Sequence, residues 1–289
     1  SLIRQQYTEN KRALRRGLNN PVEKQDWLDE PRDAALRLLT DRDHDGPEIE
    51  ALWANIGDEY FLRETPRDIS WHTEALLDRE DPDDPLVLIR ESSQSVLAGG
   101  SQIFIYTPDT RNLFSATVNA LDSLGLTIMD ARIITSVDGF SLDTYIVLDE
   151  HGTPIGEDWA RIEQIRKTLT ETLKYPDRYA TTVSRRMPRR NKHFDVPTQV
   201  VISNDIVNDR TAVDIQTLDR PGLLAHIGRI FMRFEILVQN ARIATLGERA
   251  EDVFFITDLD GEPVSDPTLC QELQQTLKQE LDDKNNGNT

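Results

Sequence analysis

The chain has 289 residues, with 51 acidic and 33 basic side chains that give a formal net charge of −18 at pH 7. So acidic a chain is a poor match for a phosphate backbone, which argues against general nucleic-acid binding. No apolar run approaches the ~20 residues that a membrane-spanning helix needs, and no signal peptide opens the sequence. The length allows about two domains, and the single Cys270 excludes an internal disulfide and suits a reducing cytoplasm.

The first part of the chain carries short helical patterns separated by polar turns, which predicts an all-helical connector over residues 1 to 80. Its apolar residues are grouped at 36 to 39, 49 to 53, 60 to 62 and 71 to 77. The segment from Asp41 to Gly46 begins like a calcium-binding loop, but Leu52 stands where that loop needs a bidentate glutamate. We therefore interpret the segment as a solvated turn before a helix and predict no metal site.

Residues 81 to 100 are predicted to form a linker. The segment begins with a run of aspartates and ends, after several serines, at Gly99-Gly100. Such a composition is typical of a boundary loop. Within it, residues 85 to 89 also suit a strand, because four of the five are apolar and two of those are β-branched.

Residues 101 to 175 follow the order strand, helix, strand, strand, helix. A β-rich run ends at Thr107-Pro108-Asp109, and apolar residues from Leu113 to Leu124 then recur at spacings of three and four. Two apolar, β-branched runs follow, at 126 to 135 and 142 to 148, on either side of a turn. A second helical pattern ends near Leu173 and completes the module.

Residues 176 to 210 are predicted to be a basic linker that also contains a strand, from Thr198 to Ser203. The basic residues are Arg185, Arg186, Arg189, Arg190 and Lys192. A solvated loop is the default interpretation of such a run. Binding of an acidic partner, or of another domain of a parent protein, is the alternative.

Residues 211 to 282 repeat the first module, and a polar tail from 283 to 289 follows. Blocks that start at Asp219, Asn240 and Asp252 match blocks that start at Asp109, Asp130 and Asp143. The offset between the copies is 110 residues for the first two pairs of blocks and 109 for the third. Self-similarity of this length indicates a duplicated module.

The two copies predict an α+β fold made of tandem ferredoxin-like modules, each a βαββαβ unit with both helices on one face of its sheet. The tail is too polar to supply the closing strand of the second copy. Seven strands are therefore expected for two modules that nominally need eight. We expect the copies to pack together, with Thr198 to Ser203 as a strand that either module could own.

The repeated blocks also resemble a known regulatory module. Asp219-Arg-Pro-Gly-Leu-Leu at a strand-to-helix turn, followed by Asn240-Ala-Arg-Ile, is similar to the ACT domain, which binds amino acids. From about residue 10 to about residue 282, the chain resembles the C-terminal part of the bifunctional uridylyltransferase/uridylyl-removing enzymes, glutamine sensors that modify the PII signal protein. Arg12-Ala-Leu-Arg-Arg-Gly17 and Ile69-Ser-Trp-His72, both outside the repeat, support this resemblance.

The resemblance implies a cytoplasmic, glutamine-sensing region whose partners are glutamine, the PII protein and the parent enzyme's catalytic domains. It implies that glutamine suppresses uridylyl transfer and promotes uridylyl removal. Mg and UTP would serve the parent, and no cofactor is expected here. The alternative function is an interaction module that docks PII or the catalytic domains without a small ligand.

No catalytic residue is predicted in this chain. We find neither the paired aspartates of the family's nucleotidyltransferase domain nor the spaced His and Asp ligands of its hydrolase domain. The sequence opens at Ser1 in a run that looks like the middle of a protein. We therefore expect a piece of a longer enzyme that is inactive alone.

The turn at Asp219 is the strongest candidate for a ligand site. A helix N-terminus offers unpaired N–H groups and partial positive charge, so the α-carboxylate of an amino acid is predicted to bind at Gly222, Leu223 and Leu224. Asp219, together with Asn240 on the facing strand, is predicted to accept hydrogen bonds from the ammonium group. The alternative is a well-capped helix that binds nothing.

Three residues of this turn are assigned local roles. Pro221 suits the first position of a helix, and Asp219 suits a helix cap. Gly222 allows a ligand backbone to approach closely. If Gly222 belongs to the helix, alanine in its place should leave the unliganded protein equally or more stable, because alanine is the better helix former.

The matching turn of the first copy is a weaker candidate. Arg111-Asn112 replaces Pro-Gly there, which removes the freedom for close approach. The corresponding candidate ligand residues are Asp109, Asn112, Leu113 and Asp130.

Overall fold

A computed structural model describes residues 21–42, 44–79, 81–82, 84–92, 99–180, 197–205, 210–246 and 248–285. The basic run from 185 to 192 lies outside these residues. The chain divides into two compact units. The first comprises Ser1–Glu80 with the turn Ser136–Asp138, and the second comprises the remainder, including both copies of the repeat.

The described residues of the first unit that precede residue 80 form helices joined by turns, as predicted. Its helices are α2 (Pro21–Thr40), α3 (Gly46–Trp53), α4 (Asp58–Arg63) and α5 (Pro66–Leu77). Apolar side chains from all of them form the core, where Leu39, Ile49, Phe61 and Ile69 are buried. Within this core the indole Nε1 of Trp53 donates to Thr73 Oγ1 at 2.9 Å, which satisfies a buried polar group.

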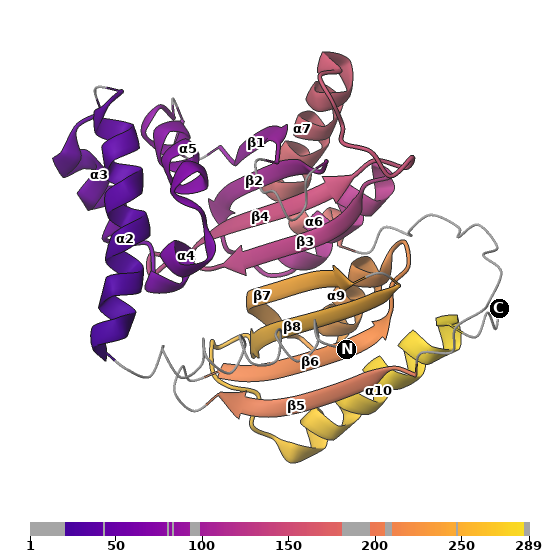
Figure 1. Cartoon of the computed structure of the whole chain (residues 1–289). Coiled ribbons are helices and arrows are strands. Elements are labelled where there is room, and N and C mark those ends of the chain that lie inside the picture. Colours follow the sequence, from indigo (N-terminus) through magenta and orange to yellow (C-terminus); the bar gives the residue numbers. More distant parts are fainter. Residues whose placement is uncertain are drawn as a thin grey trace. The chain divides into compact units, whose positions relative to one another are not determined.

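The second unit is built on one eight-stranded antiparallel sheet with the strand order β1-β2-β4-β3-β7-β8-β6-β5 (Figure 1). The first four strands in the chain are β1 (Leu86–Glu91), β2 (Ser101–Pro108), β3 (Thr127–Ile134) and β4 (Phe140–Leu148). The others are β5 (Gln199–Asp205), β6 (Arg210–Leu218), β7 (Leu237–Leu246) and β8 (Arg249–Thr257). The α+β class and the tandem ferredoxin-like modules expected from the sequence are confirmed.

The helices of the second unit lie on one side of this sheet (Figure 1). The first module contributes α6 (Leu113–Ser123), α7 (Trp159–Lys174) and the short α8 (Pro176–Tyr179). The second contributes α9 (Leu223–Arg233) and α10 (Pro267–Asn285). The end of α10 extends three residues into the predicted polar tail.

The expectation of seven strands is wrong, because each module takes its fourth strand from its N-terminal side. Residues 86 to 91, placed in a linker by the sequence, form β1, in which Leu86 pairs with Tyr106 of β2. The ambiguous strand belongs to the second module, because among the described strands β5 pairs with β6 alone. The position next to a module's first strand can be occupied by a strand that precedes the module in the chain or by one that follows it. A preceding strand reaches this position through a hairpin. Each module therefore runs ββαββα.

The two modules meet about a pseudo-two-fold axis. Strands β3 and β7 pair antiparallel with Arg132 opposite Arg242, and Asp130 and Ile134 lie opposite Ala244 and Asn240. Every pair in this ladder is consistent with the offset of 110, so the axis passes between the two arginines. Helices α6 and α9 pack against each other near this axis, on the helical side of the sheet.

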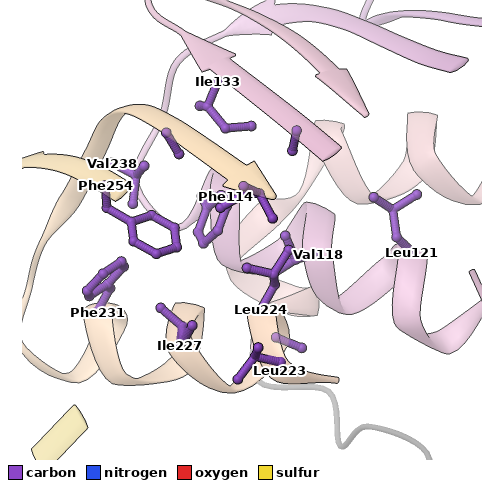
Figure 2. Packing of buried hydrophobic residues seen from close by; sticks show 14 of the residues in the cluster. Phe114, Val118, Leu121, Ile133, Leu223, Leu224, Ile227, Phe231, Val238 and Phe254 are labelled. Carbon is purple, nitrogen blue, oxygen red and sulfur yellow. The ribbon is translucent and has the colours of Figure 1, made fainter. Parts of the chain in front are cut away.

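The two modules share one hydrophobic core. Figure 2 shows Phe114 and Val118 of α6 beside Leu224, Ile227 and Phe231 of α9. The ring of Phe254, on β8, makes edge-on contacts with Phe114 at 5.7 Å and Phe231 at 5.1 Å between centroids. Because the modules share buried side chains, the expectation that the copies pack together is confirmed.

Candidate ligand-binding site

The turn at residues 219 to 222 differs from its predicted geometry. Helix α9 begins at Leu223, so Pro221 precedes the helix and does not occupy its first position. Gly222 is the N-cap residue with φ +74°, in the left-handed region, and no side chain caps the helix, so Asp219 does not cap it. Since a side chain in this region is strained, alanine at Gly222 should destabilise the protein, contrary to the sequence-based expectation.

One of the three backbone N–H groups predicted to bind a carboxylate, that of Leu223, is already used. The N–H of Leu223 donates to the carbonyl of Arg220 at 3.2 Å, and that of His226 donates to the carbonyl of Gly222 at 3.0 Å. Within the described part of the chain, the N–H groups of Gly222 and Leu224 make no hydrogen bond. The start of α9 therefore retains donors for an anion, at two of the three predicted positions.

A buried arginine fixes this turn to the end of the chain's last helix. The Nη1 atom of Arg220 donates to the carbonyl of Leu281 in α10 at 2.9 Å. Burial lowers the pKa of Arg220 to about 10, although the nearby Asp282 and Asp219 favour its charged form. Asp282 also accepts a hydrogen bond from the backbone N–H of Thr198, just before β5. The turn is thus tied to two other parts of its module.

The turn lines a cavity between the two modules. Its volume is about 40 Å³, which is enough for a few water molecules and less than an amino acid requires. The second module contributes Asp219 to Ala225, Ile243, Thr245, Ala250 and Asp252, and the first contributes Val118, Asp122 and Leu126 to Ile128. A ligand in this cavity would therefore touch both modules.

Asp252 is a candidate site residue that sequence reasoning missed. It lies in β8, lines the cavity and is fully buried. Both of its carboxylate oxygens lack a hydrogen bond of normal geometry to any described residue, although the nearby N–H of Ala244 favours the ionised form. Burial outweighs that contact and, with the negative charges of Asp219, Asp214 and Glu251, raises the pKa of Asp252 well above its usual value.

The matching carboxylate of the first module, Asp143, is fully hydrogen-bonded. It accepts from Ser141 Oγ at 2.5 Å and from the hydroxyl of Tyr145 at 3.4 Å. Burial is the main cause that raises the pKa of Asp143, to about 7, and the neighbouring Asp109 adds to it. Ala250 and Phe254 stand at the matching positions beside Asp252 and carry no hydroxyl groups.

The first module's candidates line a second, smaller cavity of about 20 Å³. Asp109, Asn112 and Leu113 lie on one side of it, and α9 and the start of β7 lie on the other. Asp109 accepts a hydrogen bond from Thr135 Oγ1 at 2.7 Å, and burial raises its pKa. Asn112, at φ +65°, donates to Asp177 of α8 at 2.8 Å. This turn is therefore engaged by its own module and, through the ion pair of Arg111 with Glu235 at 3.0 Å, also by the second module.

The structure does not bring Asn240 or Asp130 to the turn of its own module, and neither lines the two cavities described above. Asn240 pairs with Phe255 of β8, whereas the end of β6 pairs with Arg249 of the same strand. Those positions on β8 are six residues apart, or about 20 Å at ~3.4 Å per residue. Asp130 lies opposite Ala244 in the ladder, too far along the sheet to join Asp109. The geometry thus does not support their predicted ammonium and ligand contacts.

Both the helical first unit and the chain as a whole are similar to known proteins. Residues 23–75 match the family model described as "Uridylyltransferase GlnD fifth domain". Over 281 residues, or 97% of its length, the chain is 52% identical to bifunctional uridylyltransferase/uridylyl-removing enzymes of Pseudomonas putida strain KT2440 and Pseudomonas fluorescens strain SBW25. The chain matches the C-terminal part of this enzyme family. The resemblance inferred from the sequence is confirmed.

This C-terminal region spans about a third of the curated relatives, 31% of their length. A weaker likeness, with a TM-score of 0.36 and 17% identity, is to the crystal structure of aspartate kinase from Synechocystis, and it covers 63% of this chain and 27% of that one. Among the residues described by the structure, no helix is long and apolar enough to cross a membrane. In the same residues, no cluster of three His, Cys, Asp or Glu side chains suits a metal ion.

Proposed function

We propose that this chain is the glutamine-sensing regulatory region of a bifunctional uridylyltransferase/uridylyl-removing enzyme that modifies the PII protein. The observation that carries the proposal is the cavity between the modules. It combines N–H groups at the start of α9 that no described residue accepts from with carboxylates at Asp219 and Asp252. Donors at one place and carboxylates at another complement the two charges of an amino acid.

The donors at the helix start would bind the α-carboxylate. The N–H groups of Gly222 and Leu224 are available, and the partial positive charge of the N-terminus of α9 adds to their attraction. Asp219 lies in the same turn, so its carboxylate can stay close to the ligand's ammonium group. The remaining lining is mostly apolar, with Val118, Leu126 and Ile243, and suits the aliphatic part of a side chain.

The position of the cavity suggests how binding is transmitted. A ligand in this cavity contacts both the turn of the second module and α6 of the first. Binding then favours one spacing of the modules over another, since a ligand shifts an equilibrium only through a difference in affinity. In the parent enzyme, this shift would suppress uridylyl transfer and promote uridylyl removal. The isolated chain would have neither activity.

Calorimetric titration of the chain with a panel of amino acids tests this function. We expect glutamine to bind and to raise the thermal midpoint of unfolding, because a ligand that binds only the folded state stabilises it. Alanine and glutamate serve as controls for side-chain size and for the side-chain amide. Failure of every amino acid to bind would reject the sensor function and favour the alternative, a module that docks PII or the catalytic domains.

A further inference from the structure

We infer that Asp252 is a buried binding site for the ammonium group of the amino-acid ligand, and that the second module alone binds it, giving one ligand per chain. This inference rests on the proposed function. It concerns a residue in the middle of a strand, several positions away in sequence from the turn that suggested the site. The number of ligands per chain is part of the inference, because the first module contains a matching cavity that could hold a second ligand.

The two buried aspartates occupy the same place in their modules. Asp143 lies opposite Ile105 in the β2–β4 ladder, and Asp252 lies opposite Ile215 in the β6–β8 ladder. Each is nearly or fully inaccessible to solvent, with 1% and 0% exposure respectively. Each also has an aspartate of the preceding turn close enough to raise its pKa. The two carboxylates therefore occupy the same position in their modules. What differs between the modules is the set of side chains around each carboxylate.

The surroundings differ by two hydroxyl groups. Ser141 and Tyr145 donate to both oxygens of Asp143, and they flank it at two residues on either side. In the second module the flanking residues are Ala250 and Phe254, and the ring of Phe254 packs in the apolar core. A buried carboxylate needs donors, and those of Asp143 are missing around Asp252.

Asp252 lies where a ligand in the cavity can supply the missing hydrogen-bond donors. Asp252 lines the cavity together with Asp219, Thr245 and the start of α9. An ammonium group has three donors and one positive charge, so it can satisfy Asp252 and still reach the carboxylate of Asp219. The α-carboxylate of the same ligand would meet the N–H groups of Gly222 and Leu224. Recognition thus requires an amino acid with a free ammonium group.

The cavity of the first module lacks this arrangement. Asp143 is satisfied by its own neighbours and does not line the cavity there. Thr135 donates to Asp109, and the side chain of Asn112 is held by Asp177. The cavity has about half the volume of the other. Among the described residues that line it, Asp109 is the one carboxylate and it already accepts from Thr135, so we do not expect a second ligand.

The decisive experiment gives Asp252 the surroundings of Asp143. The double variant Ala250→Ser/Phe254→Tyr should hold or raise the thermal midpoint of the unliganded chain and weaken glutamine binding at least tenfold. The single variant Ala250→Ser, which leaves the packed ring unchanged, should show a smaller effect of the same sign. The matched control Ser141→Ala/Tyr145→Phe should lower the thermal midpoint and leave glutamine affinity unchanged, with one site per chain before and after.

Ligand chemistry gives an independent measurement on the unaltered chain. Glutaramic acid has the amide and carboxylate of glutamine without the ammonium group, and we expect no binding in the same calorimetric titration. Asp252→Asn should reduce the affinity for glutamine and leave the response to glutaramic acid unchanged. Two sites per chain, or unweakened binding by Ala250→Ser, would overturn the inference while leaving glutamine sensing in place.

If glutamine does not bind at all, the proposed function fails, and thermal shifts with the twenty common amino acids still test Asp252. An amino acid that stabilises the chain, and loses this effect in Asp252→Asn, would support an ammonium site for a different ligand. If none of the twenty stabilises the unaltered chain, both proposals are overturned.

Discussion

The turns that open α6 and α9 have nearly the same backbone and different chemistry. Both place a residue in the left-handed region before the helix, Asn112 in one and Gly222 in the other. Around the first turn, side chains of the same module satisfy the buried Asp143, and around the second, Asp252 keeps no such partner among the described residues. The two modules share one backbone arrangement, and the module with unsatisfied buried polar groups is the better candidate for ligand binding.

The largest expected effect concerns Asp143, whose raised pKa makes stability depend on pH. Between its usual value near 4 and its folded value of about 7, the folded state binds a proton that the unfolded state has lost. The free energy of unfolding should therefore fall as pH rises through this window, by about 1.4 kcal/mol per pH unit. Asp143→Asn cannot ionise, so its stability relative to the unaltered protein should increase from pH 5 to pH 7. Denaturant titrations at several pH values measure this difference, and parallel curves for the two proteins would contradict it.

Asp219→Ala should weaken glutamine binding more than Asp109→Ala does. A hydrogen bond to a charged group contributes about 1.5 to 3 kcal/mol, which corresponds to a loss of affinity of roughly tenfold to a hundredfold. Asp109 already accepts from Thr135, so its removal should affect stability and leave binding unchanged. Calorimetry on both variants, with melting curves to verify folding, makes the comparison. Equal losses of affinity would show that the turns are functionally equivalent.

Substitutions at Gly222 compare the two turns at a single backbone position. Alanine there should destabilise the unliganded protein by about 1 to 2 kcal/mol, because its Cβ is strained at φ +74°. Asparagine should cost less, since it tolerates this conformation and the first module uses it at φ +65°. Thermal unfolding of Gly222→Ala and Gly222→Asn, with Asn112→Gly as the reverse change, tests this ranking. An alanine variant as stable as the unaltered chain would show that the strain is relieved by local movement.

The fold was predictable from the sequence where the signals were local. The order strand, helix, strand, strand, helix follows from spacing and turn residues, and the offset between the copies showed that it occurs twice. The owner of β5 was not predictable, because an edge strand is assigned by its pairing partner. Residues 85 to 89 gave a strand signal, but their charged, serine-rich surroundings led to the prediction of a linker.

The candidate site was predictable at the turn and not beyond it. Asp219, Gly222 and Leu224 follow from the chemistry of a helix start, which is set by adjacent residues. Asn240 was expected nearby because its strand is adjacent in the sheet, but its position along the strand puts it about 20 Å away. Asp252 had a signal that aligned copies could reveal, since Ser141 and Tyr145 are replaced by Ala250 and Phe254 at an offset of 109.

The smallest expected effect lies where α6 and α9 approach each other. Gly228 corresponds to Val118 in the first module, and a Cβ at Gly228 would lie 3.1 Å from the backbone Cα of Ser115. Gly228→Ala gains about 1 kcal/mol of helix propensity and loses a comparable amount to this crowding, so we expect a net change below about 1 kcal/mol. Ser115→Gly should remove part of the crowding, and the double variant should be more stable than the two single changes predict. Unfolding of the four proteins in denaturant measures this coupling. Strict additivity would mean that the helices separate freely at this point, whereas coupling would mean that their close approach restricts the cavity of the first module.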